Sequence, residues 1–233
     1  SKAPHRASAL TTASGIEIWH VEDYTVPVVS VEFAFLGGSA QDPEGKSGLA
    51  NLAASLLDEG AGTLPSHAFQ EALEEKAIEL SFDAGRDRLD GSMRTLSDHV
   101  VEAFGFLGLA LQAPRFDQDA IERVKAQIIS SIKRDESDPG SRARDRLNTL
   151  AFPNHCYGKP ADGIIADLQS ITRADILALH GKLVARDTLK IVAVGAISAK
   201  DLVSLVEKAF GPLPKSADLI TVPDIVMQNA GLT

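Results

Sequence analysis

The stretch VVSVEFAFLGGSAQDPEGKSGLANLAASLLDEG, residues 28–60, contains the two periodicities that decide the fold. From Val28 to Leu36, large apolar side chains alternate with small or polar ones, which predicts a strand with one buried face. After Gly37 and a loop, leucine and alanine recur at helical spacing, which predicts a helix over 47–59 with one buried stripe. A strand followed by such a helix indicates a sheet that helices cover.

Outward from this stretch, strands come in pairs that are separated by pairs of helices. Strands are expected at 16–22, 79–95 (two strands joined near 86–87) and 189–195, and helices at 66–77, 97–113, 117–136, 141–152, 172–184 and 198–210. Thr172 with Asp175 forms a capping-box-like helix start, and LKIVAVG predicts a strand buried on both faces. The fold class predicted is α+β, a two-layer sandwich with a mixed, mostly antiparallel sheet and helices on one face.

Composition excludes several classes of protein. The chain has 233 residues, 44% of them hydrophobic, and a formal net charge of −9, which argues against nucleic acid as a partner. The heaviest apolar run, 26–36, is far shorter than a membrane span and contains Glu32. Because Cys156 is the single cysteine, neither an intrachain disulfide nor a thiolate zinc cage can form within the chain.

We divide the chain into three parts. Residues 1–15 are polar and without period, and are expected to be an N-terminal tail or an edge segment. Residues 16–215 are expected to form the α+β domain. Residues 216–233 follow a proline-rich exit and are interpreted as a linker that leads to a further segment.

The residues of the chain offer little chemistry by themselves. The six histidines are scattered, with no pair at the helical spacing that places two imidazoles on one metal ion. His155 and Cys156 are the only neighbouring base and nucleophile, but adjacent loop residues usually point apart, so we expect no catalysis there. Activity that disappears in Cys156→Ala would support the opposite interpretation.

Five motifs in order resemble the pitrilysin/insulinase-type zinc peptidases, the family that includes mitochondrial processing peptidase. The motifs are GGSAQDPEGKSGLANL, SFDAGRDRLDGSMRTLSDH, RDESDP, LAFPNHCYGKPADG followed by ITRAD, and LKIVAVGAIS with VEKAFGPLP. The resemblance covers about residues 16–215. It implies that residues 16–215 form one peptidase-like half, followed by a linker toward a second homologous half.

The resemblance also implies a zinc motif that this sequence lacks. The family carries His-x-x-Glu-His on the helix after the first glycine-rich loop, with a further glutamate ligand on a long helix downstream. At the corresponding positions stand Asn51, Ala54, Ser55 and, downstream, Ser131. An amide, a methyl and two hydroxyls are a poor zinc set. We therefore expect no catalytic residues and no metal or other cofactor in this chain, with zinc only in a catalytic partner.

The expected function is that of a non-catalytic subunit or half, inactive alone, which binds extended peptide and encloses a chamber with a catalytic zinc-peptidase subunit or homologous half. A dimer is therefore expected. The alternative is a scaffold of the same fold that handles no peptide. Family members bind peptides by adding a strand to a sheet edge, and the candidate edge is 28–36, with Val31, Phe33, Phe35, Gly37 and Gly38. The compartment stays open, with the bacterial periplasm as one expectation.

Overall fold

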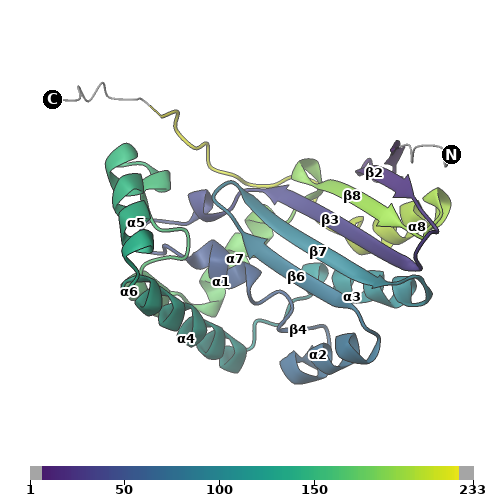
Figure 1. The fold of residues 1–233 in the computed structure, drawn as a ribbon, viewed down its shortest axis with the longest axis horizontal. Helices are drawn as coiled ribbons and strands as arrows, with labels where there is room; N and C mark the ends of the chain where they lie inside the picture. Colours follow the sequence, from purple (N-terminus) through teal and green to yellow (C-terminus); the bar gives the residue numbers. More distant parts are fainter. Residues whose placement is uncertain (1–6, 226–233) are drawn as a thin grey trace.

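The computed structural model describes residues 7–225 and contains a six-stranded sheet with the order β1-β2-β8-β3-β7-β6 (Figure 1). Only the β2–β8 pair is parallel; the other neighbours run antiparallel. A small second sheet joins β4 to β5. The strands are β1 (Ser8–Thr11), β2 (Glu17–Glu22), β3 (Val28–Leu36), β4 (Gly60–Ala61), β5 (Leu64–Pro65), β6 (Glu79–Ala84), β7 (Arg88–Leu96) and β8 (Lys190–Gly195).

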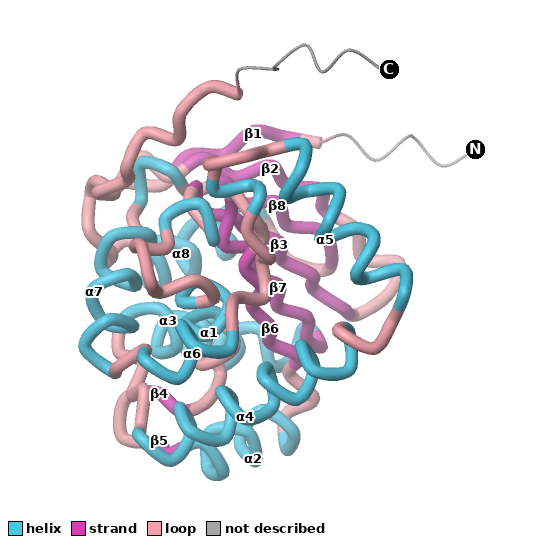
Figure 2. Tube along the Cα trace, turned by 90° about the vertical axis from the view of Figure 1, so that its left-hand side faces the viewer, coloured by secondary structure: helices cyan, strands magenta, loops and turns pink. Residues whose placement is uncertain are grey.

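Helices cover one face of the large sheet, and the other face is largely open (Figure 2). The two-layer α+β fold with a mostly antiparallel sheet is therefore confirmed. The helices are α1 (Leu49–Ala54), α2 (Ser66–Glu75), α3 (Val100–Gln112), α4 (Gln118–Asp135), α5 (Pro139–Ala151), α6 (Ile165–Ser170), α7 (Arg173–Leu183) and α8 (Ala199–Phe210), with short 3-10 turns η1 to η4 between some of them.

The hydrophobic core lies between the sheet and these helices. Phe33 of β3 is central to it, with edge-to-face contacts to Phe35, Phe82 and Phe210 at centroid distances of 6.0, 6.1 and 5.2 Å. Its ring lies over Gly91 of β7, where an added Cβ would come within 2.1 Å of the ring. The alternation in 28–36 thus places the predicted face in the core.

The prediction that 28–36 is a peptide-binding edge strand is wrong. β3 lies inside the sheet, paired with β7 on one side and with β8 on the other, so its backbone has no free edge. Val31, Phe33 and Phe35 are buried toward the helices. Gly37 and Gly38, which follow the strand, are buried as well, and Gly37 N–H donates to Asp87 O in the β6–β7 turn. The position of β3 depends on β8, which is distant in the sequence, so local periodicity could not reveal it.

Three other local predictions differ from the structure. LKIVAVG forms β8 as predicted, but its outer face is not buried, since Val192 and Val194 are 45% and 42% exposed. The helix expected at 47–59 is shorter, because α1 ends at Ala54 and continues as turns. Helix α6 falls in a stretch to which the sequence assigned no element. The capping box of Thr172 and Asp175, in contrast, is present.

Both ends of the described chain lie against the domain. Within residues 1–15, β1 forms an edge strand beside β2, and residues 1–6 lie outside the described part. In the expected linker, Ile220 N–H donates to Gln41 Oε1 at 2.8 Å and Gln41 Nε2 donates back to Ile220 O at 3.1 Å. Residues 226–233 are not described. No helix within 7–225 is long and apolar enough to cross a bilayer.

Candidate functional site

Helix α1 carries Asn51 and Ala54, two of the four positions that correspond to the family's zinc motif, and Ser55, the third, is its C-cap. The start of this helix is tightly fixed. The carboxylate of Asp42 accepts hydrogen bonds from Gly48 N–H and Ala50 N–H, both at 2.8 Å. It thereby satisfies donors of the first helical turn that have no partner within the helix. Burial raises the pKa of Asp42 to about 6, although these N–H groups act in the opposite direction. Sequence reasoning missed this residue, whose only signal was the Asp-Pro turn before the helix.

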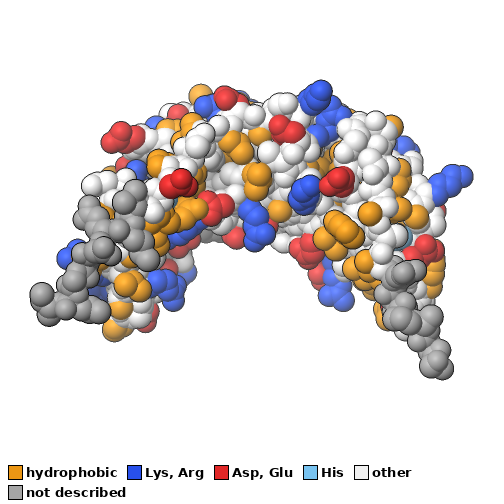
Figure 3. Space-filling model, turned by 90° about the horizontal axis from the view of Figure 1, so that it is seen from above, with side chains coloured by type: hydrophobic (Ala, Val, Ile, Leu, Met, Phe, Trp, Pro, Cys, Tyr) orange, Lys and Arg blue, Asp and Glu red, His pale blue; other side chains and the backbone are white. Residues whose placement is uncertain are grey.

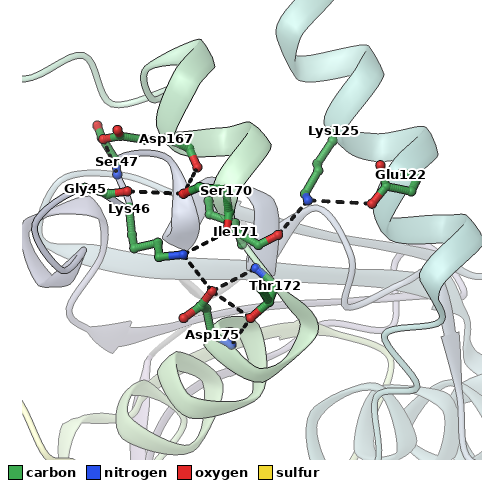
Figure 4. Close-up of polar contacts among 10 residues, drawn as sticks. All are labelled: Gly45, Lys46, Ser47, Glu122, Lys125, Asp167, Ser170, Ile171, Thr172 and Asp175. Carbon is green, nitrogen blue, oxygen red and sulfur yellow. Dashed lines mark hydrogen bonds and ion pairs between the residues drawn. The ribbon is translucent and has the colours of Figure 1, made fainter.

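Two lysines fix the loop before α1 and the helix α4 to one point of the fold (Figure 4). Lys46 Nζ donates to Ser170 O at 2.8 Å and pairs with Asp175 at 3.0 Å. Lys125 of α4, which is 7% exposed, donates to Ile171 O at 2.6 Å. Both ammonium groups thus meet carbonyls at the C-terminal end of α6, where a helix favours positive charge.

The four motif positions carry neither an imidazole nor a carboxylate. Asn51 of α1 and Ser55, the C-cap of this helix, lie one turn apart and are half-buried, and Ala54 between them is 1% exposed. Ser131, on α4, is also half-buried. The elements that carry these residues remain packed together, since α1 contacts α4, α7 and β6. The helices that carry the motif positions are therefore present and packed, but the side chains at these positions are not those of the zinc motif.

These side chains do not fit the zinc ion that the resemblance implies. Zinc sites in proteins use imidazole, thiolate or carboxylate, and the four positions offer an amide, a methyl and two hydroxyls. Across residues 7–225, no group of three or more His, Cys, Asp or Glu side chains is placed to hold a metal ion. No reaction step through zinc can therefore be derived from this chain.

The edge strand nearest to α1 is β6. It pairs with β7 alone, and in the described part of the chain no strand lies on its other side. Its side chains alternate between exposed Glu79, Ser81 and Asp83 and partly buried Leu80 and Phe82. Sequence analysis placed this strand but not its position at the edge.

His155 and Cys156 do touch, contrary to expectation, with Cys156 Sγ 3.7 Å from His155 Nδ1. The same Nδ1 accepts from Tyr157 N–H at 3.1 Å, and Nε2 lies 3.0 Å from Pro223 O. Both ring nitrogens are thus used to cap the turn η3 (Cys156–Gly158) and to hold the C-terminal segment. They border a cavity of about 760 Å³ between η3, the end of α5 and residues 220–223. The arrangement is that of a structural histidine.

Comparison with known proteins decides the family. The family model "Insulinase (Peptidase family M16)" matches residues 18–162, and "Peptidase M16 inactive domain" matches residues 170–231. The chain belongs to the insulinase family of peptidases, M16. The resemblance stated from the motifs is therefore confirmed.

The relatives include proteins with and without peptidase names. The chain is 28% identical over 214 residues to the "Non-peptidase homolog YmxG" of Helicobacter pylori, covering 90% of this chain and 50% of that protein. It is 25% identical over 207 residues to the "Mitochondrial-processing peptidase subunit beta" of Dictyostelium discoideum, covering 88% and 44%.

Among solved structures, a peptidase M16 inactive domain from Pseudomonas fluorescens superposes with a TM-score of 0.88 at 26% identity, covering 95% of this chain and 54% of that one. The chain thus spans about half the length of the M16 relatives that it matches.

Proposed function

We propose that this chain is a non-catalytic M16 domain that binds extended peptide and closes a chamber together with a catalytic M16 partner, either a separate subunit or a homologous half. One observation carries the proposal: the framework around α1 is intact while the motif positions hold Asn51, Ala54, Ser55 and Ser131. Helix α1 and its supporting contacts are present while zinc-ligating side chains are absent, and this combination favours binding over catalysis.

The peptide-binding element in this proposal is β6. An extended peptide that adds to an edge strand gains backbone hydrogen bonds, which need no catalytic side chain. β6 is the edge strand that packs against α1, so a peptide paired with it would pass beside the motif positions. This assignment replaces the strand 28–36.

The experiment is hydrogen exchange of the purified chain with and without an extended peptide, and again with an M16 peptidase that carries His-x-x-Glu-His. The amides of β6 are expected to gain protection on peptide addition. The other edge strand, β1, is the matched control, because it also has a free edge but lies at the far side of the sheet. Peptide protection that is absent, or equal at β1 and β6, would refute the assignment.

The alternative, a scaffold without peptide handling, makes a different prediction in the same experiment. A scaffold would show protection with the peptidase partner and none with peptide. It would also leave the partner's peptidase activity unchanged, whereas the proposed function requires this activity to rise when the chain is added.

A further inference from the structure

The C-terminal part of the described chain lies along the domain and is held in two different ways. Residues 214–218 are fastened through their backbone to the end of α7 and to η4 (Arg186–Thr188); Asp218 N–H, for example, donates to Lys182 O at 3.0 Å. The side chain of Leu219 then packs against the hydrophobic core. Residues 220–225, which we name the strap, continue from there toward the end of α5 (Figure 1).

Within residues 7–225, two side chains form hydrogen bonds to the strap. Gln41 of η1 (Ser39–Gln41) makes its two hydrogen bonds to the backbone of Ile220, and His155 Nε2 lies 3.0 Å from Pro223 O. Burial adds little, because Ile220 and Ile225 are 59% and 43% exposed. Figure 3 shows apolar side chains at the surface of the arm from which the C-terminus extends. The strap therefore depends on these two side chains for its position.

The strap forms one wall of the cavity of about 760 Å³ beside η3. The other walls come from the loop before α1, with Asp42 and Glu44, and from the loop around η3, with Cys156 and Lys159. Cys156 is the single cysteine of the chain and is partly buried there. Movement of the strap away from this cavity would expose the Cys156 thiol, so the reactivity of this thiol measures the position of the strap.

The hydrogen bonds of His155 require one particular protonation state of its ring. Tyr157 N–H can only donate, so Nδ1, which lies 3.1 Å away, carries no proton. The proton of the neutral ring is therefore on Nε2 and is donated to Pro223 O. A second proton, which an imidazole takes up in mildly acidic solution, would place Nδ1–H against Tyr157 N–H. Two donors that face each other repel, so the ring has to turn, and Nε2–H then leaves Pro223 O.

Charged and titratable groups of several elements surround this ring. They are Asp42 and Glu44 before α1, Cys156 and Lys159 around η3, Arg86 and Asp87 in the β6–β7 turn, which contact Tyr157, and Asp224, which follows Pro223 in the strap. The carboxylates favour a second proton on the ring and the cations oppose it. The cavity residues of α5 and its C-cap, Thr149 and Phe152, are uncharged. Burial raises the pKa of Asp42 to about 6, so this carboxyl takes up a proton in the same pH range as an imidazole.

We propose that His155 is an acid-sensitive latch for the strap: a second proton on its ring breaks the contacts to Tyr157 and Pro223, and the strap leaves the cavity. The change is local, because Leu219 keeps its place against the core and residues 214–218 keep their hydrogen bonds to α7 and η4. The latch is independent of peptide binding at β6.

Hydrogen exchange of single amides at different pH values tests the latch. Between about pH 7.5 and about pH 5.5, the protection factors of the Tyr157 and Ile220 amides should fall about tenfold, the effect of one lost hydrogen bond. The Asp218 amide, which donates to Lys182 O, is the matched control in the same segment and should keep its protection. Constant protection at Tyr157 and Ile220, or an equal fall at Asp218, would overturn the proposal.

His155→Gln separates the imidazole from Asp42. Glutamine carries a donor and an acceptor, as the neutral ring does, but it does not titrate. The protection factors of Tyr157 and Ile220 should therefore no longer depend on pH in this variant. If the pH dependence persists, Asp42 or another group causes it, and the assignment of the latch to His155 is wrong.

The Cys156 thiol reports the position of the strap independently. In Gln41→Ala, which lacks both hydrogen bonds to Ile220, iodoacetamide at about pH 7.5 should alkylate Cys156 about tenfold faster than in wild type. Gln112→Ala is the matched control and should leave the rate unchanged, because Gln112 also donates to a backbone carbonyl, that of Ala209, but joins α3 to α8. An equal rate in Gln41→Ala and wild type would mean that the strap does not cover the cavity, and the proposal would fail.

Discussion

Ala54→Glu returns the missing glutamate to the motif helix, and the structure predicts that the folded protein accommodates it poorly. Ala54 is 1% exposed and packed between buried neighbours of α1. A glutamate in such a place escapes the cost of burying its charge by taking up a proton. From an unfolded pKa of about 4.3, protonation at pH 7 costs about 4 kcal/mol. Fitting the larger side chain into this packed site lowers the free energy of unfolding by about a further 1–3 kcal/mol.

The predicted loss of unfolding free energy depends on pH with a definite sign. Burial raises the pKa of the new carboxyl above its unfolded value, so its penalty is absent below about pH 4.3 and grows as the pH rises. At pH 5 the protonation cost is only about 1 kcal/mol, so the deficit relative to wild type should shrink by about 3 kcal/mol between pH 7 and pH 5.

The assay is urea denaturation of wild type and variant at both pH values, followed by tryptophan fluorescence or circular dichroism. Asn51→Glu, one turn earlier at a half-buried position, is the matched control and should cost less than about 1 kcal/mol at either pH. If Ala54→Glu costs no more than the control, or if its deficit does not change with pH, the position is not a closed apolar site and the reasoning fails.

Three further predictions concern the fixed framework, all measured by urea denaturation. Lys125→Met should cost about 1–3 kcal/mol because Ile171 O loses its donor, while Lys133→Met, on the exposed end of the same helix, should cost almost nothing; equal costs would contradict the lysine contact. Gly48→Ala should cost more than Gly15→Ala: both have positive φ, but a Cβ at Gly48 meets Leu168 at 2.8 Å and one at Gly15 meets nothing within 4 Å. Asp58→Asn should increase stability at pH 7, because burial raises the pKa of Asp58 to about 6, so its carboxylate destabilises the fold increasingly as the pH rises from about 4 to 6; no change at pH 7 would refute this.

Sequence patterns predicted the local elements well, because these depend on neighbouring residues. The alternation in 28–36 gave β3 and its buried face, and Thr172 with Asp175 gave the start of α7. The order of the strands in the sheet could not be predicted from such local patterns. β3 is internal because β8, about 160 residues later, pairs with it, and the exposed face of β8 follows from a layer of helices that covers one side only.

The candidate site was accessible only in part. The resemblance located Asn51, Ala54, Ser55 and Ser131 by position, but not the contacts that support their helices. Lys46 and Lys125 are separated in sequence from the carbonyls they bind at 170 and 171, and no spacing rule connects them. The free edge of β6 likewise depends on the whole sheet.

Metal content of the purified chain tests the central claim most directly. After incubation with zinc and dialysis, elemental analysis should find far less than one zinc ion per chain, because Asn51, Ala54, Ser55 and Ser131 supply no zinc-binding set. One tightly bound zinc ion per chain, retained through dialysis and lost with peptidase activity on chelation, would contradict the account.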